Sequence, residues 1–383
     1  MSNYSEFLVF GATGQQGGVV ARALREAGRE VRAFVRNPQS EKAKALAAEG
    51  ITLAVGDLFD RASIDRAMTG IHGVFSVQTS SPSGLVTDEQ EIAQGKAIAD
   101  SAVGAGVAHL VYSSGGAAGK GHTGMGHFDS KSQIEAHIRS LPIAATITRP
   151  ASFMEMMMLP GMGLNSGIFT FFMQRNQSMQ MIALDDLGRI NAQILCQPER
   201  YTSHVLELSG QDVTGEYLEE AFSRAAGRHI RYQRFSQDLL AGNDFLRRLT
   251  TLVDDGVVAG VADIPALERE FGPMLKLDQW LSGPGKVLFE EALNAPQGWY
   301  STTVMHKTCG RKALQTVALS LTLTMFSLPL QHLLGTLHVQ RVEAFGEALQ
   351  HAGQQLCGLV PPVLARPAPG QARGCAQLPG ERS

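Results

Sequence analysis

The sequence has few cysteines, and their spacing does not suggest a shared site. Four of its 383 residues are cysteine, Cys196, Cys309, Cys357 and Cys375, and none form a closely spaced pair. This argues against a disulfide scaffold and against a zinc module, and it is typical of proteins from a reducing compartment. We therefore expect neither structural disulfides nor a bound metal.

The sequence also lacks an excess of charge of either sign. It contains 33 Lys and Arg against 36 Asp and Glu, a formal net charge of −3. Domains that bind nucleic acids through the phosphates are usually basic, so direct nucleic-acid binding is not expected. Residues 298–383 differ from the rest, with seven basic and three acidic residues, which leaves 26 basic and 33 acidic residues in the first 297. The two parts need separate interpretations.

The first 150 residues alternate short apolar runs with amphipathic segments, a pattern typical of buried parallel strands joined by helices. This alternation predicts an α/β fold with a doubly wound parallel sheet, the Rossmann fold. The first run is too short, and the segment before it too lightly charged, for a secretory signal, so we expect a cytoplasmic protein. The predicted strands cover residues 6–10, 31–35, 51–55, 74–77, 109–113 and 145–148, and the predicted helices cover a segment ending at Gly28 and residues 40–48, 61–69 and 88–104.

A glycine-rich loop follows the first predicted strand. Gly11, Gly14 and Gly17 lie between that strand and the first helix. Glycines at this place permit a tight turn and let backbone N–H groups approach a pyrophosphate, and the helix N-terminus adds partial positive charge. The spacing is one residue wider at its start than the form usual in dehydrogenases. It predicts a dinucleotide site, with a plain turn into a helix as the alternative.

The residue after the second predicted strand indicates which dinucleotide fits. An NAD site usually has an acidic residue about 20 positions after the glycines, which accepts a hydrogen bond from the ribose 2′-hydroxyl. Arg36 occupies that place, with Lys42 and Lys44 nearby. A guanidinium suits a 2′-phosphate, which a carboxylate would repel. The sequence therefore favours NADP(H), and the alternative is a solvated loop arginine.

Several stretches together resemble the NmrA-like family, an atypical branch of the short-chain dehydrogenase/reductase superfamily. The resemblance extends to about residue 295 and is strongest to members that act as NADP(H)-responsive regulators. The same family includes reductases of quinones and triarylmethane dyes. The matching stretches are residues 11–17, 35–38, 56–57, 111–114, 127–131, 149–155, 186–188 and 214–228.

The resemblance implies which residues contact the cofactor. For Asp57, an N-cap of the following helix is an equally good interpretation. The implied contacts are Gly11, Thr13, Gly14, Gln15 and Gly17 along the pyrophosphate, Arg36 at the 2′-phosphate, Asp57 beside the adenine, Gln78 and Thr79 at the nicotinamide half, and Lys131 on the nicotinamide ribose.

The tyrosine expected of a catalytic member is missing. In such members a tyrosine four residues before the lysine protonates the substrate, and here the pair is His127 and Lys131. Spacing of four residues places both side chains on one helix face. His127 could donate a proton near neutral pH, because imidazole titrates there. The alternative is a histidine that only forms a hydrogen bond near the pocket mouth. These two are the candidate catalytic residues.

Residues 151–297 are predicted to form a smaller, mostly helical lobe, with strands near 179–183 and 205–208. Thr214 is expected to cap a helix over 215–226 that Gly227 ends. Eight of the fourteen methionines lie between Met154 and Met181, and Phe153, Phe169, Phe171 and Phe172 add aromatic surface to this segment. Such a lining can repack around a small apolar or quinone-like ligand, and ordinary core filling is the alternative.

Residues 298–383 form an atypical extension without a counterpart in the family pattern. Residues 313–340 contain no Asp, Glu, Lys or Arg, which raises the question of a membrane span. Polar residues dilute the stretch, so a membrane span is not favoured. An amphipathic docking helix is about as plausible as a span. The proline-rich residues 361–383 are expected to be disordered.

These observations favour one function and leave a second open. The favoured hypothesis is an NADP(H)-binding regulator that senses redox state through a protein partner. The alternative is an NADPH-dependent reductase of quinone-like or dye-like acceptors, which need little more than orientation and a dry pocket. The oligomeric state is not predicted.

Overall fold

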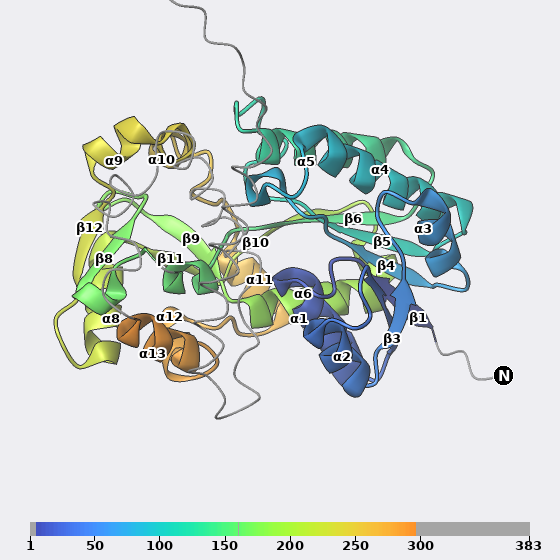
Figure 1. Cartoon of the computed structure of the whole chain (residues 1–383), viewed down its shortest axis with the longest axis horizontal. Helices are drawn as coiled ribbons and strands as arrows, with labels where there is room; N and C mark the ends of the chain where they lie inside the picture. The colour runs from blue at the N-terminus through green and yellow to red at the C-terminus, as the bar shows by residue number, and fades with distance from the viewer. Residues whose placement is uncertain (1–4, 160, 296–383) are drawn as a thin grey trace, which may run out of the picture. The chain divides into compact units, whose positions relative to one another are not determined.

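The computed structural model describes residues 5–159 and 161–295. A seven-stranded parallel sheet in the order β10-β6-β5-β4-β1-β2-β3 forms the centre of the larger part (Figure 1). This confirms the predicted doubly wound fold. Its strands are β1 (Glu6–Val9), β2 (Glu30–Val35), β3 (Thr52–Val55), β4 (Gly73–Ser76), β5 (His109–Ser113), β6 (Ala145–Pro150) and β10 (Val205–Leu208).

Helices cover both faces of the sheet, as Figure 1 shows. Along β1 and the residue after it, Phe7 and Val9 contribute to one core cluster and Leu8 and Phe10 to the other, so this apolar run is buried on both faces. The helices α1 (Gln15–Glu26), α2 (Glu41–Ala48) and α6 (Leu184–Cys196) cover the first face, and α3 (Arg61–Met68), α4 (Asp88–Gly104) and α5 (Gly126–Ser140) cover the second.

The strand at residues 205–208 corrects one prediction. It was expected in the smaller lobe, but β10 pairs in parallel with β6, Val205 opposite Ile147. The helix α6, which lies earlier in the chain, packs against α1, so the chain has already returned to the main sheet when β10 begins. Sequence order predicts a strand well, but it does not show which sheet the strand will join.

The smaller lobe has its own core and two small sheets. One contains β7 (Ser152–Phe153), β9 (Met179–Ile182) and β11 (Gln211–Val213), and the other pairs β8 (Ile168–Phe171) with β12 (Arg231–Arg234). Thr214 caps α8 (Gly215–Ala226) by accepting from the Tyr217 N–H, and Gly227 ends that helix with φ of 62°, both as predicted. The other helices are α7 (Pro198–Tyr201), α9 (Gln237–Gly242), α10 (Asp244–Asp254), α11 (Ile264–Phe271), α12 (Leu277–Ser282) and α13 (Lys286–Asn294), with short 3₁₀ turns η1 (Ser81–Ser83), η2 (Met154–Met158) and η3 (Leu164–Ser166).

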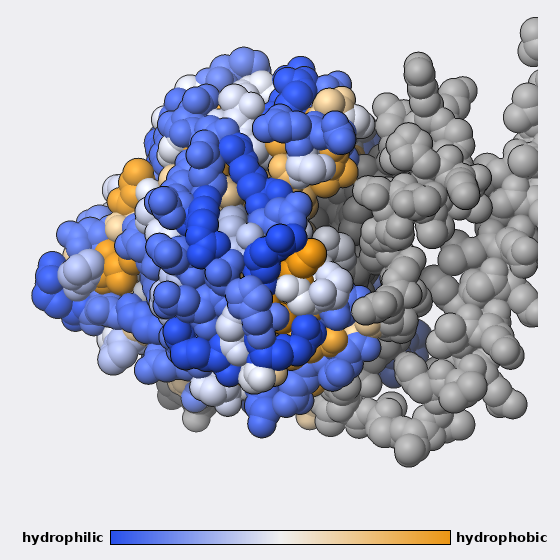
Figure 2. All heavy atoms as spheres, turned by 90° about the vertical axis from the view of Figure 1, so that its left-hand side faces the viewer, coloured by the Kyte–Doolittle hydropathy of each residue, from blue (hydrophilic) through white to orange (hydrophobic). Residues whose placement is uncertain are grey.

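The methionine-rich segment mostly fills the core of this lobe. Six of its eight methionines are buried there together with Phe169, Phe171 and Phe172. Core filling is thus confirmed for these side chains, which leaves them unable to line a ligand pocket. The face of the molecule seen in Figure 2 is mostly hydrophilic, with hydrophobic residues in small separate groups. The buried methionines are Met154, Met157, Met158, Met173, Met179 and Met181.

One carboxyl group connects the two parts of the molecule. Glu155 in η2 accepts hydrogen bonds at Oε1 from the Leu184 backbone N–H (3.1 Å) and from the Trp280 indole N–H (3.2 Å). Leu184 begins α6 on the main sheet, and Trp280 is buried in the core of the smaller lobe. The second oxygen, Oε2, is buried without a partner, and burial raises the pKa of this carboxyl from 4.5 to about 7. Near neutral pH the folded protein therefore holds a proton here that the unfolded chain releases.

We expect Glu155→Gln to stabilise the protein at alkaline pH. The raised pKa means that the free energy of unfolding of the wild type falls as the pH rises from about 4.5 to about 7. The amide stays neutral, so the variant should be more stable at pH 8 by about 2 kcal/mol and similar to the wild type near pH 4.5. Urea unfolding at both pH values measures this, and the exposed Glu290→Gln serves as control. A variant less stable at pH 8 than the wild type would contradict the prediction.

Candidate functional site

Most of the residues predicted to bind a cofactor lie at one edge of the main sheet. The strands are parallel, so the loops after them meet at their carboxyl ends, where ligands of such sheets bind. The loop after β1 carries the three glycines, and Arg36 and Asp57 follow β2 and β3. Gln78 and Thr79 follow β4, and Lys131 lies in the second turn of α5. The order β3-β2-β1-β4-β5 thus places the predicted adenosine side and nicotinamide side on opposite sides of β1.

The glycine loop has no room for side chains at two of its glycines. Gly11 has φ of 67°, and a Cβ there would lie 2.6 Å from Cγ1 of Val77. A Cβ on Gly17 would lie 2.4 Å from the backbone carbonyl carbon and oxygen of Gly11. The first turn of α1 therefore packs directly on the loop backbone, and only glycine permits this approach.

The N-terminus of α1 is open to an anion. Its N-cap, Gly14, has no side chain to cap the helix, and the first turn contains no acidic residue. The first N–H groups of a helix have no acceptor within it, so these donors and the helix dipole are available to a phosphate. Thr13 is partly buried beside them, and Gln15 is the first residue of the helix.

On the adenosine side, Arg36 is exposed and its guanidinium has no hydrogen-bond or ion-pair partner in the described part of the chain. This leaves it available to a phosphate and does not exclude a solvated arginine. Asp57 accepts at Oδ1 from the Phe59 N–H, 3.0 Å away, in a local turn. The N-cap of α3 is Asp60, so the N-cap interpretation of Asp57 is wrong. Its place beside an adenine stays a prediction.

On the nicotinamide side, Gln78 presents an unsatisfied polar atom. Its Nε2 donates to Oγ of Ser76 at 2.7 Å, while its Oε1 is buried without a partner. Buried carbonyl oxygens are nearly always hydrogen-bonded in native proteins, so an unpaired one indicates a missing donor. The next residue, Thr79, is partly buried at the same edge.

Lys131 is held by a carboxylate that the sequence analysis did not single out. Its ammonium forms an ion pair with Glu91 in the first turn of α4, and it donates to Oγ of Ser80 at 3.4 Å. The side chains of Lys131 and Glu91 are 13% and 1% exposed, so water screens this pair little. The pair connects α4, α5 and the loop after β4.

His127 lies in an aromatic stack. Its ring centroid is 4.1 Å from that of Phe128 and 5.5 Å from that of Phe245 in α10. Burial, together with the nearby charge of Lys131, lowers the pKa of His127 from 6.5 to about 3. The imidazolium is thus disfavoured near neutral pH, which argues against His127 as the proton donor. No hydrogen bond of its ring is found in the described part either, so stacking is the interaction it makes.

The residues at the end of β5 are engaged within the protein. Tyr112 is buried, and burial raises the pKa of its hydroxyl well above the usual value. Oγ of Ser113 donates to Oε1 of Gln16 in α1 at 2.6 Å. Oγ of Ser114 donates to the buried Glu135 at 2.6 Å, and Arg149 holds the same carboxylate with two hydrogen bonds. These contacts leave Ser114 unsuited to orienting a substrate.

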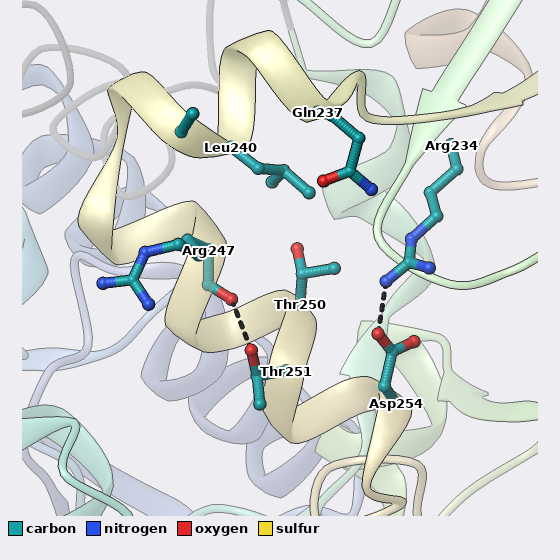
Figure 3. A pocket seen from close by; sticks show the side chains of 8 residues that line it. Arg234, Gln237, Leu240, Arg247, Thr250, Thr251 and Asp254 are labelled. Carbon is teal, nitrogen blue, oxygen red and sulfur yellow. Dashed lines mark hydrogen bonds and ion pairs between the residues drawn. The ribbon is translucent and has the colours of Figure 1, made fainter.

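A separate pocket of about 250 Å³ lies in the smaller lobe between α9 and α10. In Figure 3 its two interactions are internal: Arg234 pairs with Asp254, and Thr251 bonds to the Arg247 carbonyl. None of the residues predicted to bind the cofactor lines it, and we assign it no role. The lining residues are Arg234, Gln237, Leu240, Ala241, Arg247, Thr250, Thr251 and Asp254.

Comparison with known proteins gives the family. Residues 3–254 match the model of the NmrA-like family. The chain belongs to the NmrA-like family. An NmrA-like family domain-containing oxidoreductase, lnaB of Aspergillus flavus, is 32% identical over 248 residues, which cover 59% of this chain and 74% of that protein.

Solved structures share the fold of this NmrA-like protein. The triphenylmethane reductase of Citrobacter sp., complexed with NADP(H), has a TM-score of 0.62 and 22% identity, covering 76% of this chain and 100% of that one. NmrA, a negative transcriptional regulator in complex with NAD, has a TM-score of 0.61 and 20% identity, covering 75% and 98%. At these identities the likeness concerns the fold.

The residues of this NmrA-like protein fit a nicotinamide dinucleotide. Three features lie along one edge of the sheet. They are the space beside Gly17, which any Cβ would fill, the open N–H donors of α1, and Oε1 of Gln78, which has no partner among the described residues. Among the described residues, the Arg36 guanidinium has no partner, and it lies at the end where a 2′-phosphate would bind. Among the described residues no cluster suited to a metal ion is found, and no helix is long and apolar enough to cross a membrane. The predictions for residues 298–383 fall outside the described residues.

Sequence reasoning missed Glu91 and Phe245 for different reasons. An acidic residue in a first helical turn usually interacts with the helix dipole, so Glu91 gave no sign of being buried. Phe245 is more than a hundred residues from His127 along the chain, and a single sequence shows no such contact. For Gln16, which accepts from Ser113, the sequence did offer a signal: a polar side chain at the second position of α1, next to the glycine loop.

We expect Gly17→Ala to destabilise the protein. Its Cβ would collide with the Gly11 backbone, which cannot yield as a flexible side chain can. The free energy of unfolding should fall by roughly 1–3 kcal/mol, as for other overpacked sites. Gly104→Ala at the end of α4 is the control, because nothing lies within 4 Å of its added Cβ. Equal stability of both variants in chemical denaturation would show that α1 does not pack on the loop as described.

We expect the His127 ring to stay neutral from pH 8 down to about pH 4.5. Its pKa of about 3 follows from burial and from the charge of Lys131. Proton NMR of the imidazole signals over this range measures it, with His127→Phe identifying the signal while keeping an aromatic ring in the stack. A titration midpoint between about pH 6 and 7 would restore His127 as a candidate acid.

Proposed function

We propose that this NmrA-like protein binds NADP(H) and acts as a redox-sensing regulator, through a protein partner whose affinity depends on the oxidation state of the cofactor. One observation carries the proposal: the glycine loop packs tightly at the expected cofactor edge, while His127 stands where catalytic members have a tyrosine. A protein that holds the cofactor without a proton donor is suited to reporting its state. The description of NmrA, a structure of the same fold, as a transcriptional regulator in complex with NAD supports this function.

The cofactor assignment rests on the charge at the adenosine end. Bound NADPH would supply a hydride at its nicotinamide ring. Gly11, Gly14 and Gly17 and the first N–H groups of α1 would hold the pyrophosphate, and Arg36 the 2′-phosphate. Gln78 and Thr79 would border the nicotinamide half, and Lys131 would reach the ribose. The low cysteine content supports a reducing, cytoplasmic location.

Reduction of a planar acceptor is the second candidate function. The stack of His127, Phe128 and Phe245 favours it, since an aromatic surface beside Lys131 can orient a flat quinone-like or dye-like molecule. Such an acceptor needs no acid from the protein, because water can supply any proton. The names of lnaB, an oxidoreductase, and of the Citrobacter triphenylmethane reductase support this candidate.

A turnover assay separates the two functions. The purified full chain is incubated with NADPH and a panel of quinones and triarylmethane dyes, and oxidation of NADPH is followed by absorbance. The regulator hypothesis predicts binding without acceptor-dependent turnover. Sustained turnover with any acceptor would overturn it in favour of the reductase.

We expect Arg36→Ala to remove the preference for NADPH over NADH. Loss of the guanidinium should weaken NADPH binding about tenfold or more, because a charge-assisted hydrogen bond to the 2′-phosphate is lost, and leave NADH binding nearly unchanged. Calorimetry with both cofactors measures this. Arg247→Ala, an exposed arginine of α10, is the matched control. Tighter binding of NADH than NADPH by the wild type would refute the assignment of NADP(H).

A further inference from the structure

Glu91 is buried at the predicted nicotinamide side, yet it is charged and closely paired. Its residue is 0% exposed, and its carboxylate accepts from the Lys131 ammonium and from Oγ of Ser80 at 3.3 Å. The backbone N–H of Ser81 lies 3.4 Å from the same oxygen. A buried carboxylate in this setting is costly unless its charge is compensated, and Lys131 supplies that compensation.

The position of the pair follows from the strand order. The glycine loop after β1 is suited to the pyrophosphate, and the residues expected at the adenosine, Arg36 and Asp57, follow β2 and β3. The remaining half of a dinucleotide must therefore lie over β4 and β5. Ser80, which contacts both members of the pair, follows Gln78 in the loop after β4. This step rests on the proposed binding of NADP(H).

The two oxidation states of the cofactor differ at this end by one charge. The oxidised nicotinamide ring is a cation, whereas the reduced ring is neutral, and the rest of the two molecules is the same. An uncompensated ammonium beside the ring would disfavour the oxidised form. We propose that Glu91 sets the relative affinity of the site for NADP⁺ and NADPH by neutralising Lys131.

Two neighbouring groups already respond to the charges of the pair. The charge of Lys131 contributes to the lowered pKa of His127, one helical turn away on α5. The charge of Glu91 contributes to the raised pKa of the Tyr112 hydroxyl, which is buried without a partner. Fields that act on these side chains would also act on a ring bound at this end of the site, because buried charges are screened little.

The test is the ratio of two dissociation constants in Glu91→Gln. This variant keeps the shape of the side chain and removes its charge, so Lys131 is left uncompensated. At about pH 6, the ratio of Kd for NADP⁺ to Kd for NADPH should rise roughly tenfold over the wild type. Glu89→Gln is the matched control, because Glu89 lies exposed in the same helical turn and should leave the ratio unchanged.

The reciprocal variant guards against a purely structural effect. Lys131→Met leaves the carboxylate uncompensated and should shift the ratio in the opposite direction, towards NADP⁺. The double variant, neutral at both positions, should return the ratio to within about threefold of the wild type, as expected for two coupled charges. If Glu91→Gln does not fold, which circular dichroism reveals, the Lys131→Met and double variants alone decide.

The outcomes separate this inference from the proposed function. Equal loss of affinity for both cofactors in Glu91→Gln and Lys131→Met would overturn the inference and leave NADP(H) binding intact. Failure of the wild type to bind either cofactor would overturn the proposed function itself. A shift of the ratio in opposite directions in the two single variants supports the inference, since damage to the fold would lower both affinities together.

Discussion

The close approach of Gly17 to the backbone of Gly11 is the constraint on which the cofactor edge depends. It brings the first turn of α1 against the loop after β1, so the open N–H groups of that helix face the edge where the strands end. α1 in turn packs on α6, and α6 leads the chain to β10 at the border of the sheet. The absence of a Cβ at Gly17 thus lets α1 take the position that forms the anion site and supports the helix layer on one face of the sheet.

Buried charge is concentrated on the other side of β1. Glu91 and Glu135 are both fully buried; Glu91 is paired with Lys131, and Glu135 with Arg149 and with Arg139. The two pairs differ in use. Arg149 also pairs with Glu207 and joins β6 and β10 to α5, which makes that group a structural connection. Lys131 and Glu91 instead pair beside the loop after β4, where their charges would interact with a bound ligand.

The sequence predicted those features that depend on local patterns. The bounds of β5, α4 and α8 follow from apolar periodicity and from caps such as Thr214, which act within a few residues. The partner of β10 and the protonation of His127 could not be predicted this way. Both depend on long-range packing: β10 on the return of the chain through α6, and His127 on Phe245 and the charge of Lys131. Burial of Glu91 belongs to the same class, because its helix position is that of an ordinary surface acid.

The electrostatics of the site also limit its chemistry. A group can act as a general acid near neutral pH only if it holds a proton there and can release it, and His127 and Tyr112 fall short for opposite reasons. His127 is unprotonated because burial and Lys131 disfavour its cation, and Tyr112 holds its proton too tightly because burial and two carboxylates disfavour its anion. A cofactor bound here would lie against the close-packed glycine loop and near the paired charges of Lys131 and Glu91, but neither His127 nor Tyr112 would readily give it a proton. Such surroundings can distinguish the oxidised from the reduced ring, or deliver a hydride to an acceptor that takes its proton from water. Both proposed functions need only this, which explains why the residues at the edge fit either of them and why turnover has to decide.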